Sequence, residues 1–84
     1  MNRQEKLEML ANKNFNGMKV RDIIYWTREN VNGNVAIYDI RSRMYVDKWN
    51  NEVLNMVPKK VTFHRGYGFG QIDTVVRVFI PKNK

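Results

Sequence analysis

The sequence predicts an α+β domain in which two N-terminal helices precede an antiparallel four-stranded sheet, with a short helical turn between its two hairpins. Apolar residues recur at helical spacing over residues 20–31 and alternate at strand spacing over residues 73–80. Turn-forming residues separate the segments in the order helix, helix, hairpin, helical turn, hairpin. The 84 residues suit one small domain: an N-terminal helix or arm (1–16), an α+β core (17–80) and a basic tail (81–84).

The first helix is expected over residues 2–12, where Asn2 can act as the N-cap. Leu7, Leu10 and Ala11 share one face at the spacing i, i+3, i+4. Residues 13–17 read KNFNG, and Asn and Gly both tolerate turn geometry. Because so short a helix is marginal in isolation, it either docks through Leu7, Leu10 and Phe15 or forms a mobile arm.

A stronger amphipathic helix is predicted over residues 20–30. Its apolar stripe follows the helical period and comprises Val20, Ile23, Ile24, Thr27 and Val31. Trp26 flanks the stripe, and polar side chains occupy the far side. The segment NVNG at residues 30–33 ends the helix, with Gly33 available for a left-handed conformation. We expect this helix to pack on one face of the sheet.

Four strands are predicted after the helices. Residues 34–40 are apolar on both faces, as in a central strand, and residues 41–43 connect them tightly to a less buried strand at 44–49. Residues 50–56 form a helical turn that Pro58 ends. The third and fourth strands cover residues 61–67 and 73–80. The last strand alternates between two faces, with Val76, Val78 and Ile80 on one and Val75, Arg77 and Phe79 on the other.

The net charge of +7 is concentrated in the C-terminal half of the chain. Residues 1–40 carry six basic and five acidic side chains, whereas residues 41–84 carry nine basic and three acidic ones. Such asymmetry favours a polyanionic partner, which is a nucleic acid, an acidic protein surface or an anionic membrane. No predicted helix is both strongly basic and deeply apolar, which disfavours the membrane. The alternative is a solvated basic surface without a specific partner.

The residues that carry chemistry are too few and too scattered for an enzyme. One histidine and no cysteine leave few nucleophile–base pairs, and the eight carboxylates form no acid–base pattern. No histidine pair, acidic loop or cysteine cluster indicates a metal site. Gly66, Gly68 and Gly70 lack the GK[ST] ending of a phosphate-binding loop, and no helical pattern follows them. We therefore expect no catalysis, no metal and no cofactor.

The cysteine-free composition fits a reducing, intracellular setting. No apolar run approaches the roughly 20 residues that span a bilayer. The N-terminal segment NRQEKLEML contains acids and no long apolar stretch, unlike a signal peptide. A cytoplasmic location is therefore expected, and the cytoplasm of a host cell is included in that expectation.

One local motif points to nucleic acid. Residues 65–69 read RGYGF, which resembles the first ribonucleoprotein motif of RNA-recognition domains and the KGYGF-like strand of cold-shock domains. On a strand, Tyr67 and Phe69 share a face and can act as stacking platforms for bases, while Arg65 contacts a phosphate. The alternative is a glycine-rich hairpin connection whose Tyr67 and Phe69 shield the sheet edge.

A second resemblance covers more of the chain. Residues 18–40, MKVRDIIYWTRENVNGNVAIYDI, look like the opening of small phage-encoded and mobile-element domains, in which a short helix runs into a strand. The hairpin, short turn and second hairpin that follow are similar too. This resemblance implies an accessory protein of the anti-defence type, such as an anti-CRISPR protein, that acts by binding host or phage machinery.

These patterns predict a non-enzymatic basic protein that engages a nucleic acid or nucleoprotein through its C-terminal half. The alternative is a phage-type inhibitor that binds and blocks a host protein, such as a defence nuclease, at an acidic or nucleic-acid-binding surface. Either would be a monomer or a small homo-oligomer. The binding residues expected from the sequence are Arg41, Arg43, Lys59, Lys60, His64, Arg65, Tyr67, Phe69 and Arg77.

Overall fold

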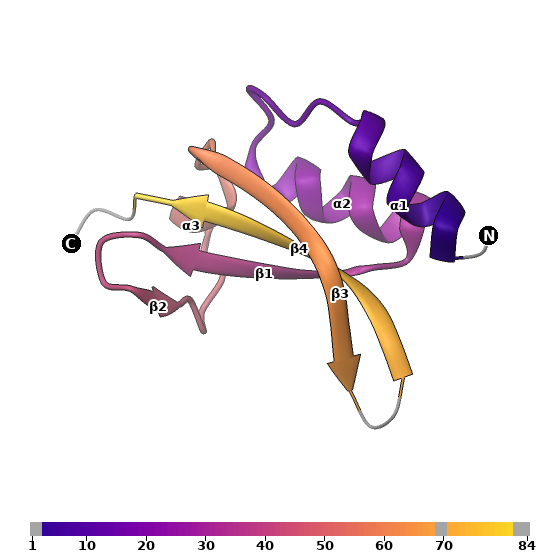
Figure 1. The fold of residues 1–84 in the computed structure, drawn as a ribbon. Helices are drawn as coiled ribbons and strands as arrows, with labels where there is room; N and C mark the ends of the chain where they lie inside the picture. The colour runs from indigo at the N-terminus through magenta and orange to yellow at the C-terminus, as the bar shows by residue number, and fades with distance from the viewer. Residues whose placement is uncertain (1–2, 69–70, 82–84) are drawn as a thin grey trace.

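The structure is a computed structural model that describes the backbone of residues 3–68 and 71–81 and the side chains of residues 4–64 and 74–81. Within these residues the elements are α1 (Arg3–Asn12), α2 (Val20–Val31), β1 (Asn34–Asp39), β2 (Met44–Tyr45), α3 (Asn51–Leu54), β3 (Lys60–Gly68) and β4 (Gln71–Ile80). The α+β class is confirmed. The three helices lie on one face of a four-stranded sheet, and the opposite face of the sheet is not covered by them (Figure 1).

The sheet is mixed, so the expectation of a purely antiparallel sheet is wrong. Its strand order is β2-β1-β4-β3. Both predicted hairpins form, because β1 pairs with β2 and β3 pairs with β4 in antiparallel fashion. The two hairpins then join through β1 and β4, which run parallel with Asn34 opposite Val75 and Asp39 opposite Ile80.

The parallel pair is compatible with where apolar residues lie. Both β1 and β4 carry apolar side chains on both faces, although the helices cover only one face of the sheet. Placing these two strands side by side in the middle leaves the shorter β2 and the lysine-led β3 at the edges. Short strands and lysines are features that discourage pairing with other chains at a sheet edge.

The apolar stripe predicted for α2 is confirmed, since Val20, Ile23, Ile24, Thr27 and Val31 are its buried residues. This stripe packs on the inner face of the sheet, to which Ile37 of β1 contributes together with Val76, Val78 and Ile80 of β4. The face assignment predicted for β4 is thereby confirmed. Val53 of α3 completes the same core.

The end of α2 differs from the expectation at Gly33. Asn32, and not Gly33, adopts the left-handed conformation, with φ 49° and ψ 40°. Gly33 is buried, and a Cβ atom built on it would lie 2.9 Å from the carbonyl oxygen of Thr74. The glycine is therefore required for close approach of the chain to β4 and not for its backbone conformation.

The segment after β1 is less extended than predicted. The strand expected over residues 44–49 is limited to Met44–Tyr45, although the Val46 amide still donates to the Ile37 carbonyl at 2.8 Å. The Trp49 indole Nε1 donates to the Val46 carbonyl at 3.1 Å, which folds the chain back on itself. α3 then begins at an N-cap, because the Asn50 side chain accepts from the Val53 amide.

The first helix docks on α2. Leu10 is buried, and the ring of Phe15 meets that of Trp26 edge-on, with 5.5 Å between the ring centroids. Leu7 is half-buried, whereas Ala11, on the predicted face, is exposed. The helix is therefore attached mainly by one leucine and by the aromatic pair that follows it.

Candidate nucleic-acid interface

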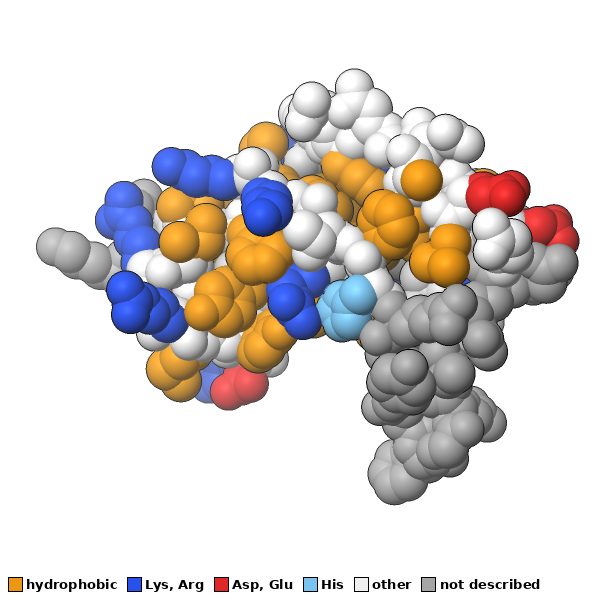
Figure 2. Space-filling view, in the orientation of Figure 1, with side chains coloured by type: hydrophobic (Ala, Val, Ile, Leu, Met, Phe, Trp, Pro, Cys, Tyr) orange, Lys and Arg blue, Asp and Glu red, His pale blue; other side chains and the backbone are white. Residues whose placement is uncertain are grey.

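Among the described side chains, the uncovered face of the sheet carries three aromatic rings and several cations. Strand alternation and register place Tyr45 of β2, Tyr38 of β1, Phe79 of β4 and Lys60 of β3 in one row across the sheet. The next row is Ala36, Arg77 and Thr62, and the row after it is Asn34, Val75 and His64. Figure 2 shows this side, where hydrophobic side chains lie among Lys and Arg, with the histidine beside them.

The three aromatic rings form a continuous cluster. Tyr38 lies in its centre, with its ring centroid 5.3 Å from that of Tyr45 and 5.5 Å from that of Phe79. The interplanar angles of 77° and 62° are edge-on arrangements, in which the positive edge of one ring meets the negative face of another. Tyr45 is 50% exposed, and Tyr38 and Phe79 are half-buried. Part of each ring is thus open to a ligand.

Two cations lie over this cluster. The Lys60 Nζ atom is 5.8 Å from the centroid of Phe79, and the Arg77 Cζ atom is 5.7 Å from that of Tyr45. Both distances suit cation–π attraction. Positive charge therefore accompanies the aromatic surface on both sides of Tyr38.

Arg77 reaches Tyr45 across β1, because the residue opposite it on that strand is Ala36, whose methyl group leaves the space free. Its Nε atom is buried and has no hydrogen-bond partner among the described residues. A guanidinium that has lost part of its water interacts more strongly with an incoming anion than a fully hydrated one. Arg77 is thus a preformed contact for a phosphate or carboxylate.

Further basic residues lie at the end of the sheet where β1 and β4 finish and β3 begins. Arg41 and Arg43 are exposed in the turn after β1. Asp39 shapes this turn, because its carboxylate accepts from the Arg41 amide at 3.1 Å and its carbonyl accepts from the Arg43 amide at 2.9 Å. Lys59 is exposed, and its amide donates to the Phe79 carbonyl at 2.9 Å. The end of the aromatic row is therefore bordered by cations.

The residues predicted from the sequence fall into three groups. Lys60, His64 and Arg77 share the uncovered face. Arg41, Arg43 and Lys59 border one end of it. The side chains of Arg65 and Tyr67, and all of Phe69, lie outside the described residues. The predicted stacking surface of the RGYGF motif therefore lies outside the described side chains.

The sequence pattern did not reveal Tyr38, Tyr45 and Phe79 as candidate binding residues. Alternation along β4 did place Phe79 and Arg77 on one face of that strand. Alternation along β1 likewise places Tyr38 and Ala36 on one face. The missing information was the parallel pairing of β1 with β4, which brings Tyr38 next to Phe79. That pairing joins segments about 40 residues apart, which no local pattern reveals.

In the described part of the chain, neither a metal cluster nor a membrane span accompanies this face. No group of three His, Cys, Asp or Glu residues there is placed to hold a metal ion. No helix in that part is long and apolar enough to cross a membrane. The row of aromatic rings with cations over it makes the uncovered face of the sheet the candidate site.

Comparison with known proteins adds no relative to these observations. The sequence matches no protein-family model and no curated protein, and the chain matches no solved structure.

Proposed function

We propose that the protein is a non-enzymatic binding protein that engages nucleic acid through the uncovered face of its sheet. The observation that carries this proposal is the row of Tyr45, Tyr38 and Phe79, with Arg77 and Lys60 over its outer rings. The net charge of +7 supports the same partner.

The chemistry of the face favours unpaired bases over a duplex. Base stacking on an aromatic ring contributes roughly 1–3 kcal/mol and needs a base whose face is accessible. In a duplex the bases stack on one another, so the rings of this face would meet only backbone. Arg77, Lys60 and the cations at the end of the sheet would contact phosphates of a strand that crosses the row. A single-stranded nucleic acid is accordingly the expected ligand.

Tyr45→Ala tests this proposal, because Tyr45 is the most exposed of the three rings and its removal costs the fold little. The affinity for a labelled single-stranded oligonucleotide, measured by fluorescence anisotropy, should fall by roughly 1–3 kcal/mol. Arg77→Gln should make the slope of log affinity on log salt shallower by about 0.7, the contribution of one phosphate contact in a single strand. Melting curves of both variants establish that the protein remains folded.

The matched controls lie on the helical side of the molecule. Tyr25→Ala removes an aromatic ring that is 68% exposed on α2, and Lys19→Gln removes an exposed cation at the N-cap of the same helix. Neither should change single-strand affinity beyond the small effect of net charge. Equal losses from Tyr25→Ala and Tyr45→Ala would contradict the assignment of the sheet face.

The inhibitor hypothesis predicts a different result with the same variants. A protein partner captured from cells would stay bound after nuclease treatment, whereas partners held through nucleic acid would be released. If Tyr45→Ala abolished this nuclease-resistant capture and left oligonucleotide affinity unchanged, the face would bind a protein. That outcome would replace the nucleic-acid proposal.

A further inference from the structure

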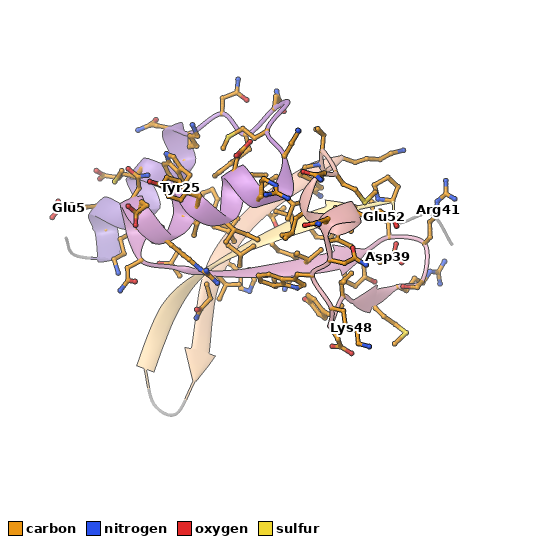
Figure 3. All side chains as sticks on the ribbon, turned by 180° about the vertical axis from the view of Figure 1, so that it is seen from behind. Glu5, Tyr25, Asp39, Arg41, Lys48 and Glu52 are labelled. Atoms are coloured by element: carbon orange, nitrogen blue, oxygen red, sulfur yellow. The ribbon has the colours of Figure 1, made fainter. Side chains whose placement is uncertain are left out.

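A second candidate site lies on the helical side of the molecule, away from the sheet face. It is a pocket of about 230 Å³ between one flank of α2 and the segment that connects β2 to β3. Its lining residues are Arg21, Ile24, Arg28, Trp49 and Leu54. At 100° per residue, Ile24 and Arg28 lie on the flank of α2 opposite Trp26, whose ring meets that of Phe15. Figure 3 shows this helical side of the molecule, with α2 in front of the sheet.

The floor of this pocket is apolar and fixed in place. Ile24 is 8% exposed and belongs to the core, while Leu54 is half-buried on α3. The Trp49 indole cannot turn freely, because its Nε1 atom donates to the Val46 carbonyl. The pocket therefore presents a preformed apolar surface without hydrogen-bonding groups of its own at the floor.

Two arginines form the rim. Arg21 and Arg28 are seven residues apart on α2, which places them about 10 Å apart along the helix axis with Ile24 between them. Arg21 is oriented by a hydrogen bond of 3.0 Å from its Nε atom to the Asn55 side-chain oxygen at the end of α3. Arg28 is exposed. The pocket thus combines one apolar position with a cation on either side.

We infer that this pocket binds an acidic peptide segment of a protein partner, in which one large aliphatic residue lies between two carboxylates. In an extended peptide, residues four positions apart lie on the same face about 13 Å apart, and the residue midway between them shares that face. The long side chains of Arg21 and Arg28, about 10 Å apart along the helix axis, can reach two carboxylates at that spacing. A guanidinium binds a carboxylate through paired hydrogen bonds, and the aliphatic side chain would fill the floor. A nucleotide suits the floor less well, because the polar edges of its base would find no partner there.

This inference is independent of the proposed nucleic-acid binding, because the pocket and the aromatic row lie on different sides of the sheet. A chain with both sites would hold an acidic protein segment and a nucleic acid at the same time. Failure of either site leaves the other untouched.

The test is an NMR titration of the full chain with a blocked peptide in which one leucine lies midway between two glutamates four positions apart, so that all three side chains share one face of the extended peptide. The chain has two tryptophans, so the Trp49 indole N–H signal reports on the pocket and that of Trp26 serves as an internal reference. We expect the Trp49 signal to shift and saturate while the Trp26 signal stays in place. Replacing the leucine of the peptide by serine should weaken binding about tenfold, the effect of burying one aliphatic side chain.

Variants of the protein separate this pocket from a general attraction to acids. Arg28→Gln should weaken peptide binding about three- to fivefold, as expected for an exposed charge pair. Arg41→Gln, which removes an exposed cation in the turn after β1, should leave it unchanged. An unmoved Trp49 signal, equal affinity for the serine peptide, or equal loss from the two variants would overturn the inference. So would a single-stranded oligonucleotide that shifts Trp49 at lower concentration than the peptide.

Discussion

Gly33 lies where the chain leaves α2 and meets β4, and a side chain there would collide with the sheet. A Cβ atom would lie 2.9 Å from the Thr74 carbonyl oxygen and 3.3 Å from a methyl carbon of Thr27. The first of these contacts involves backbone, which cannot move without shifting β4. The position therefore couples the end of the helix to the central strands.

Gly33→Ala should lower the free energy of unfolding by about 1–3 kcal/mol, the usual cost of adding atoms to a filled space. Chemical denaturation monitored by circular dichroism would measure the change. Gly17→Ala is the matched control: Gly17 has φ 80° but no atom within 4 Å of its Cβ position, so its cost comes from backbone conformation alone. A Gly33→Ala variant as stable as the parent would show that this contact has room to relax.

At the scale of elements, the parallel pair of β1 and β4 decides the architecture. It joins two hairpins into one sheet and aligns Tyr38 with Phe79. It also places the small side chain of Ala36 opposite Arg77, which reaches across β1 to Tyr45. Any other pairing of the hairpins would separate the members of the aromatic row. The candidate interface is consequently a product of this one contact between strands.

Paired cysteines test the parallel register, since the chain has no cysteine of its own. Asn34 and Val75 are opposite each other on β1 and β4. Their Cα atoms are about 5 Å apart, within the range of a disulfide. The variant Asn34→Cys/Val75→Cys should therefore oxidise to an intramolecular bond, detected by mass spectrometry.

The control pair is Asn34→Cys/His64→Cys, because His64 lies opposite Val75 on β3, one strand farther away. That distance is about 10 Å, beyond the reach of a disulfide. Efficient oxidation of the control pair, or none in the Asn34 and Val75 pair, would contradict the strand order β2-β1-β4-β3.

At the scale of the whole molecule, strand pairing and buried side chains are distributed unevenly between β4 and α1. From Val75 to Phe79, β4 is paired on both sides, with β1 and with β3, and Val76 and Val78 are fully buried. By contrast, Leu10 is the one residue of α1, within its described part, that is fully buried. Elements with few buried contacts open without unfolding the rest of a domain.

Native-state hydrogen exchange should reveal this difference. The amides of Val76 and Val78 should exchange only through global unfolding, whereas those of α1 should exchange at a clearly lower free energy of opening. The amides of Ile23 and Thr27 in the buried stripe of α2 should follow β4 and serve as the reference. If α1 were protected as strongly as β4, it would belong to the same cooperative unit and the arm would be essential to the fold.

Local pattern was sufficient for the parts of this protein that depend on period alone. The stripe of α2 follows the helical period of 3.6 and the faces of β4 follow the strand period of 2, so both could be predicted residue by residue. The two hairpins could be predicted as well, because the strands of each are joined by a short connection, and the second connection is rich in glycine.

Tertiary structure decided what depends on contacts between distant segments. Alternation shows which residues of a strand share a face, but it does not specify which other strand lies next to it. The pairing of β1 with β4 could therefore not be predicted from the sequence pattern. The requirement for glycine at position 33 could not be predicted for the same reason. It arises from the Thr74 carbonyl oxygen, which belongs to a residue about 40 positions away in the sequence. Charge, which adds up along the chain, indicated a polyanionic partner from the sequence alone. The rings of Tyr45, Tyr38 and Phe79 are brought together only by the pairing of β1 with β4. The reason is that a binding surface requires side chains that are close in space, whatever their distance in the sequence.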